Sequence, residues 1–201
     1  DKIIVTARTS GDSRDTNGIT LFLVDSGASG VSRRDYTTND ALRASEIEFA
    51  GVQVGADAVI GNIDGGHAII ERVAEFAIAA LCAEAVGCMD VLKEETNEYI
   101  KTREQFGQPI GSFQAVRHRV ADMQMRVDQA RLMTYHLADL ISADAPCRRE
   151  AAQAKVIATE TLLDVANDGM QILASAGYAA ESDMQRIWRD ARLYTFGEGT
   201  N

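Results

Sequence analysis

The sequence predicts an α+β protein in which a partial antiparallel β-domain precedes an all-α four-helix bundle. Three observations lead to this prediction. Alternating strand patterns end near residue 60, and helical periodicity continues from about residue 67. The glycine-rich stretch "GNIDGG", residues 61–66, separates the two patterns. We therefore expect residues 1–63 to form the β-domain and residues 64–201 to form the helical domain.

The strands are predicted from alternation of side chains along two segments. In "ITLFLV", Ile19, Leu21 and Leu23 are expected to share one face of a strand. In "SEIEF", Ile47 and Phe49 alternate with two glutamates, so one face of this strand is expected to contact solvent. The order of the strands cannot be derived from these patterns.

Four helices are predicted in the second part of the chain. The first runs from His67 to about Arg103, and the second follows the turn "GQPIG". A third begins after the break at Pro146, and a shorter fourth runs from about Ser182 to Tyr194. The second helix carries apolar residues at three- and four-residue steps, namely Val116, Val120, Met123, Val127, Ala130, Met133, Leu137 and Ile141. The third carries a stripe of small and apolar residues, namely Ala151, Ala154, Ala158, Leu162, Val165, Gly169 and Ile172.

Composition excludes several classes of function. The 20 basic and 30 acidic residues give a net charge of −10, which argues against nucleic-acid binding. No apolar run approaches the ~20 residues that span a bilayer, and "DKIIVTARTS" shows no secretory signal. Cys82, Cys88 and Cys147 are expected as reduced thiols in a cytoplasmic protein. No metal site is expected, because no cysteine or histidine pair has ligand spacing.

Two segments resemble the acyl-CoA dehydrogenase family. "KTREQFGQPIGSFQAVRHRVADM", residues 101–123, is similar to the family segment R-x-x-F-G-x-x-[IL]-x-x-x-Q, and "RDARLYTFGEGTN", residues 189–201, contains its E-G-T-[NS] turn. The first 63 residues resemble the second half of the family's central β-domain. The resemblance covers essentially the whole chain, but the family's N-terminal helical domain and its flavin-facing β segments are not in the sequence. We therefore expect an incomplete piece that alone is inactive and binds FAD poorly.

The resemblance implies FAD-dependent oxidation of an acyl-CoA thioester to the trans-2-enoyl-CoA. In this reading, Glu198 removes the proton from the α-carbon while hydride leaves the β-carbon for flavin N5. Gly197 and Gly199 are expected to allow the unusual backbone that aims the carboxylate at the substrate. Some relatives carry the base at the position of Ala77, where alanine cannot act. Without the resemblance, a solvated glutamate in a glycine turn would explain the same pattern.

Cofactor and substrate residues are also implied by the resemblance. The residues matching FAD contacts are Arg103, Gln105, Phe106, Phe113, Gln114, Gln171, Ser175, Thr200 and Asn201. The residues matching substrate contacts are Glu75, Ile78 and Gly199. Two departures stand out. Ala174 and Ser175 replace a glycine pair that approaches the flavin, and Ile78 replaces an arginine found in many relatives.

The implied partners are an acyl-CoA substrate, an electron-transfer flavoprotein as electron acceptor, and further copies of the chain in a homodimer or homotetramer. Two alternatives remain open. One is a non-catalytic structural subunit of a hetero-oligomeric acyl-CoA dehydrogenase, and the other is an oxidase or flavin monooxygenase on the same fold. The helices taken alone would equally suit an adaptor.

Overall fold

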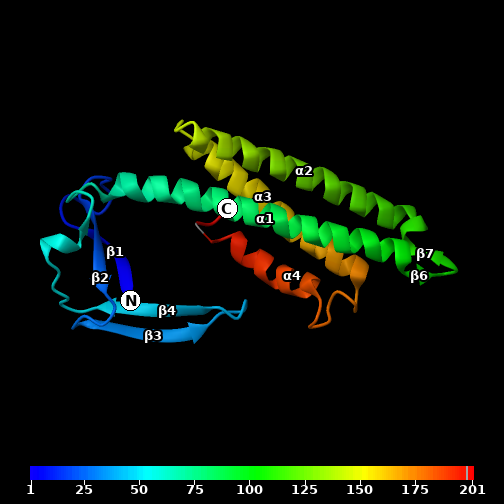
Figure 1. Ribbon diagram of the computed structural model, residues 1–201, viewed down its shortest axis with the longest axis horizontal. Coiled ribbons are helices and arrows are strands. Elements are labelled where there is room, and N and C mark those ends of the chain that lie inside the picture. The colour runs from blue at the N-terminus through cyan, green and yellow to red at the C-terminus, as the bar shows by residue number, and fades with distance from the viewer. Residues whose placement is uncertain (198) are drawn as a thin grey trace. The chain divides into compact units, whose positions relative to one another are not determined.

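The computed structural model describes residues 1–197 and 199–201. Its contacts divide the chain into two compact units, Asp1–Ala74 and Glu75–Asn201. The first is mainly built of strands and the second of helices, which confirms the predicted α+β class (Figure 1). Helix α1, Gly66–Thr102, begins in the first unit and continues into the second. The domain boundary predicted between residues 63 and 64 falls in the loop before α1 and stays a prediction.

The first unit contains two small antiparallel sheets. Strands β1 (Lys2–Arg8), β2 (Ile19–Asp25) and β5 (Val59–Ile60) pair in the order β1-β2-β5. Strands β3 (Val31–Thr37) and β4 (Arg43–Phe49) form the second sheet as a hairpin. A short 3₁₀ helix, η1 (Ala56–Ala58), leads into β5.

A buried hydroxyl network fixes the loop before α1. Thr20 is fully buried, and its hydroxyl lies 2.6 Å from that of Thr9 and accepts the backbone N–H of Asp64 at 2.8 Å. Leu21 is also buried, whereas Leu23 is 41% exposed. The predicted face of apolar residues on β2 is therefore only partly buried, and Thr20 and Val24 on the opposite face are buried as well.

The second unit is built around four helices. After α1 come a two-stranded hairpin, β6 (Glu104–Gln105) and β7 (Gln108–Pro109), and the 3₁₀ helix η2 (Ile110–Ser112). Helices α2 (Gln114–Ser142), α3 (Arg148–Leu173) and α4 (Asp183–Tyr194) follow. Pro146 lies between α2 and α3, as predicted. Ser182 caps α4 by accepting the backbone N–H of Met184 at 3.1 Å, so the helix starts directly after it.

The core of this unit lies between the helices, and α2 and α3 run side by side (Figure 1). The predicted stripe of α3 is buried from Ala151 to Gly169, while Ile172 is only partly buried. A Cβ added to Gly169 would lie 2.7 Å from Met184 Cε and 3.1 Å from Thr96 Oγ1. Small residues on α3 therefore allow close approach to α1 and α4.

Two predictions made from composition can be compared with the fold. All three cysteines are free thiols, as expected. None of the helices in the described part of the chain is long and apolar enough to cross a membrane.

Candidate functional site

The hairpin after α1 forms one wall of a surface cavity of about 320 Å³. The opposite wall comes from the first turns of α2 and the end of α3. The cavity is lined by Gln105, Phe106, Ile110, Phe113, Ala115, Val116, Arg119, Gln171 and Ile172. The cavity thus brings together four of the nine residues predicted to bind the cofactor, from segments at least 58 residues apart, namely Gln105, Phe106, Phe113 and Gln171.

The hairpin turn contains an exposed phenylalanine whose backbone conformation is unusual. Phe106 and Gly107 connect the paired residues Gln105 and Gln108, with φ of 54° and 80°. Two successive left-handed residues form a tight turn that suits glycine and strains phenylalanine. The Phe106 side chain is 91% exposed, and its ring meets that of Phe113 edge to face at 6.1 Å. The exposed ring of Phe106, supported by the partly buried ring of Phe113, can stack on a flat ligand.

The cavity also has a positive group that sequence reasoning had passed over. Arg119 lines it and donates to Asp168 on α3 at 3.0 Å. Arg119 is not among the residues that the family resemblance implies for the cofactor. Only its distance along α2 from Gln114 could have pointed to the cavity, and that signal is weak.

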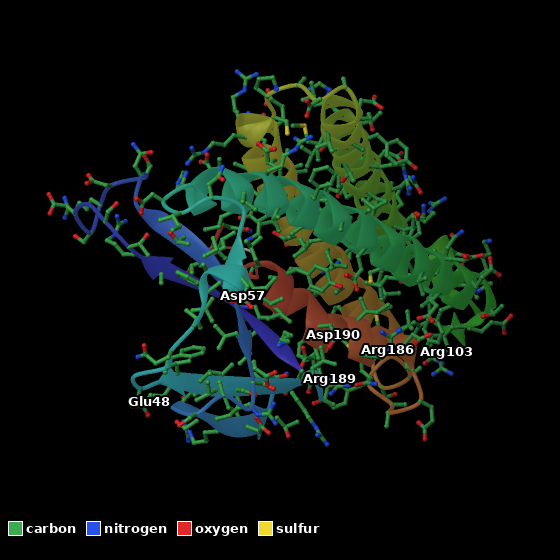
Figure 2. The ribbon with its side chains drawn as sticks, turned by 60° about the vertical axis from the view of Figure 1, so that its left-hand side comes forward. Glu48, Asp57, Arg103, Arg186, Arg189 and Asp190 are labelled. Atoms are coloured by element: carbon green, nitrogen blue, oxygen red, sulfur yellow. The ribbon has the colours of Figure 1, made fainter. Side chains whose placement is uncertain are left out.

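The other residues predicted to bind the cofactor near this end of the unit lie outside the cavity lining. Arg103 is exposed directly after α1 (Figure 2), and its carbonyl accepts the backbone N–H of Ile110 at 2.8 Å. Gln114 is exposed at the first position of α2, and Ser175 is exposed just beyond α3. Their contact with a cofactor stays a prediction.

The backbone is strained where α3 ends, at Ala174, which stands in place of the first glycine of the family's glycine pair. Ala174 caps the helix with φ 50° and ψ −127°. A side chain is disfavoured in this region of backbone conformation, which glycine enters freely. The glycine that the family resemblance implies at this position would enter this conformation without strain, whereas the alanine of this chain adopts it at a cost.

A second group of predicted residues lies after α4. Gly199 has φ 110°, so the expectation that a glycine is needed there for the backbone is confirmed. Gly197 does not adopt a positive φ. Instead, a Cβ there would lie 3.3 Å from the carbonyl oxygen of Leu193, so Gly197 serves close packing against the end of α4. Glu198, the predicted catalytic base, lies outside the residues that the structure describes.

Hydrogen bonds tie this C-terminal segment to α3. The buried Lys155 donates from Nζ to the carbonyl oxygen of Thr195 at 3.0 Å, to the side-chain oxygen of Asn201 at 2.6 Å, and to the carbonyl of Gly199. Thr200 and Asn201, both predicted to bind the cofactor, also line a cavity of about 430 Å³ with Glu160, Leu163, Asp164, Arg192 and Thr195.

The predicted substrate residues on α1 differ in their surroundings. Ile78 packs against the buried core of the helical unit, and Glu75 is half-buried at the first position of that unit. The third, Gly199, belongs to the C-terminal segment. Their contacts with a substrate stay predictions.

Burial perturbs several ionisable groups between α1 and α4. Burial raises the pKa of the Cys82 thiol to about 11. Burial, followed by a hydrogen bond to Glu84, raises the pKa of the Tyr194 hydroxyl, so this group remains a neutral donor.

Figure 2 shows Arg186, Arg189 and Asp190 on α4, where Arg186 forms an ion pair with Asp183 at 2.9 Å.

Two further observations limit the choice of site. Among the described residues, no cluster of three or more metal-ligating side chains exists. A larger cavity of about 970 Å³ lies between α1, η2 and α2, but its lining contains none of the predicted site residues and mixes lysines with carboxylates. The small aromatic cavity and the C-terminal segment are therefore the two candidate places for site residues in the described part of the chain.

Comparison with known proteins agrees with this geometry. Residues 64–201 match the family model described as "Acyl-CoA dehydrogenase, C-terminal domain". A probable acyl-CoA dehydrogenase of Bacillus subtilis is 34% identical over 99% of this chain and 53% of its own length. The butyryl-CoA dehydrogenase structure from Megasphaera elsdenii is 30% identical with a TM-score of 0.90, covering 100% of this chain and 53% of that one. A structure of PigA with FAD and proline is 29% identical with a TM-score of 0.95 and the same coverage.

The chain spans about half the length of the curated relatives it matches. The match to the family model extends over more than half of the chain, and the structural neighbours cover all of it. The chain belongs to the acyl-CoA dehydrogenase family.

Proposed function

We propose that the complete protein carrying this chain is an FAD-dependent acyl-CoA dehydrogenase. Glu198 removes a proton from the α-carbon of an acyl-CoA thioester as hydride leaves the β-carbon, giving the trans-2-enoyl-CoA. Membership of the family supports the proposal, together with the φ of 110° at Gly199, the residue directly after Glu198. A carboxylate beside such a turn has the backbone freedom that a positioned base needs.

The aromatic cavity fits part of a dinucleotide cofactor. Phe106 and Phe113 offer ring faces or edges, and Gln105 and Gln171 offer amides. Arg119 supplies a guanidinium, which suits a diphosphate by charge and by its forked geometry. A volume of about 320 Å³ holds a portion of FAD rather than the whole molecule. When bound, FAD would supply the hydride acceptor at N5.

The remaining residues take roles in the same proposal. Arg103, Gln114, Ser175, Thr200 and Asn201 complete the set that contacts FAD, while Glu75, Ile78 and Gly199 border the acyl-CoA. The electron acceptor is an electron-transfer flavoprotein, and the assembly is a homodimer or homotetramer in the cytoplasm. These assignments follow from family membership and from the residues at matching positions.

One alternative has an observation in its favour. Ala174 and Ser175 stand where relatives carry glycines, and the strained φ of Ala174 would suit a subunit in which no flavin approaches this turn. Such a subunit would be structural rather than catalytic. A second alternative, an oxidase or monooxygenase on the same fold, agrees with a structural neighbour named as the prolyl acyl carrier protein oxidase AnaB, which is 26% identical with a TM-score of 0.92.

A spectroscopic titration separates these possibilities. The complete protein is expected to contain one FAD per chain and to lose its flavin absorbance when a suitable acyl-CoA is added without oxygen. A substoichiometric flavin content and no bleaching with a panel of acyl-CoA thioesters would contradict the proposal in favour of a structural subunit. Rapid reoxidation of the reduced flavin by oxygen, rather than by an electron-transfer flavoprotein, would favour the oxidase.

A further inference from the structure

A lysine lies on the buried face of α3, where its neighbours are small. Lys155 is 4% exposed, and Ala151 and Ala158, one turn before and one turn after it, are 2% and 0% exposed. A buried ammonium is stabilised only when hydrogen-bond acceptors replace its water. The position of those acceptors therefore indicates what the lysine holds in place.

Three acceptors of Lys155 come from one short segment. Nζ donates to the carbonyl oxygens of Thr195 and Gly199 and to the side-chain oxygen of Asn201. Thr195 precedes residue 198 and Gly199 follows it, so the lysine binds the chain on both sides of the predicted base.

A threonine one turn further along α3 reinforces the same segment. The Asn201 amide donates to the Thr159 hydroxyl at 3.0 Å, and that hydroxyl donates to the carbonyl of Lys155 at 2.8 Å. The backbone N–H of Asn201 donates to Thr195 at 3.1 Å, which closes the segment on itself. Thr159 is fully buried, so its side of these contacts is shielded from water, while Asn201 is exposed.

The residue before the segment is also held in place. Tyr194 is the last residue of α4 and packs against the buried core of the helical unit. The segment thus begins at a residue packed on the core and is hydrogen-bonded to α3 along its length. Gly199 alone would leave the backbone mobile, because glycine has the widest choice of conformations.

We propose that Lys155 is a positioning residue for the catalytic base. It acts through the backbone of Thr195 and Gly199, on either side of Glu198, and loss of these contacts is expected to slow removal of the α-proton. This inference rests on the proposed function. Proton transfer requires the reacting atoms to be about 3–3.5 Å apart, and a displacement of about 1 Å can cost roughly 10²-fold in rate.

The test uses the complete FAD-loaded protein and single-turnover flavin bleaching under anaerobic conditions. Varying the acyl-CoA concentration gives a limiting rate constant for flavin reduction and a dissociation constant for the substrate. Lys155→Met keeps the length of the side chain but removes all donors, whereas Lys155→Arg keeps charge and donors. Lys101→Met changes an exposed lysine of α1 and serves as the matched control.

We expect Lys155→Met to lower the limiting rate constant by about 10- to 100-fold while the substrate dissociation constant changes by less than about threefold. Lys155→Arg should restore part of the rate, and Lys101→Met should behave as wild type. A purely structural lysine would lower only the fraction of folded enzyme, which changes the amplitude of bleaching and not its rate constant. A wild-type rate constant in Lys155→Met would overturn the proposal.

Two further variants keep the test decisive. If Lys155→Met does not fold, Thr159→Val removes the hydroxyl that holds Asn201 while leaving the lysine, and a reduced rate constant is again expected. A wild-type rate constant in Thr159→Val would then count against the proposal. Glu198→Gln is measured in parallel. If it bleaches as wild type, the base assignment itself fails, whereas a slow Glu198→Gln with a fast Lys155→Met refutes the positioning role alone.

Discussion

Replacing Ala174 by glycine should stabilise the protein, which is the opposite of the usual effect of glycine. Ala174 ends α3 with φ 50° and ψ −127°, and this conformation costs a residue with a side chain about 1–3 kcal/mol. The substitution also loosens the unfolded chain, which costs about 0.4–1 kcal/mol. Relief of the backbone strain therefore exceeds the entropic cost, and the free energy of unfolding should rise by about 1 kcal/mol.

Ala176 provides a matched control two residues away. It is exposed like Ala174, but its φ is not positive. Ala176→Gly removes no strain, so only the entropy of the unfolded chain changes and a loss of about 0.4–1 kcal/mol is expected. The two variants therefore differ in sign, although both exchange an exposed alanine for glycine in the same turn.

Urea unfolding of the complete protein, followed by far-ultraviolet circular dichroism, measures both effects. Ala174→Gly should raise the urea midpoint without changing the slope of the transition, and Ala176→Gly should lower it. If both variants lower the midpoint equally, Ala174 carries no backbone strain. The explanation that glycine suits position 174 because of its positive φ would then be wrong.

Three other predictions concern the helical unit. Leu162→Ala should lower the free energy of unfolding by about 2–5 kcal/mol in urea titrations, because Leu162 is fully buried. Arg131→Met removes two hydrogen bonds of 2.7 and 2.8 Å to Asp90, and the partly exposed pair contributes only about 0.2–1 kcal/mol. Burial raises the pKa of Asp90, but hydrogen bonds from Arg131 and Lys93 outweigh it and hold the pKa below 3.8. The contribution of the Arg131–Asp90 pair to the free energy of unfolding is therefore complete above about pH 5. The urea midpoints of Arg131→Met and wild type should converge as pH falls through the lowered pKa of Asp90. A difference between the two midpoints that does not change with pH would contradict this assignment. Burial raises the pKa of Cys82 to about 11, so at pH 8 a thiol reagent should modify Cys82 far more slowly in native than in urea-unfolded protein.

The helical architecture could be predicted from sequence because its periodicity is local. The stripe on α3 from Ala151 to Gly169 is buried as its spacing predicts. The start of α4 follows from Ser182, whose hydroxyl is a typical helix cap. The left-handed conformation of Gly199 was also expected, because a glycine beside a functional carboxylate suggests backbone freedom.

The missed features depend on contacts between distant segments. Lys155 lies on the same stripe as Ala151 and Ala158, and a lysine in that register is a signal of burial that was overlooked. Its acceptors, about 40 residues later, could not have been derived from local pattern. Phe106 was recognised by motif, but its positive φ was not, since an aromatic side chain rarely adopts that conformation.

The most direct test of the central claim is the rate of flavin bleaching in Glu198→Gln. This variant keeps the size and shape of the side chain but cannot accept the α-proton, so the limiting rate constant with a suitable acyl-CoA should fall by at least about 10²-fold. The bound FAD and the substrate dissociation constant should remain close to wild type, and Glu181→Gln, an exposed glutamate between α3 and α4, should bleach normally. Wild-type bleaching by Glu198→Gln would show that another group removes the proton.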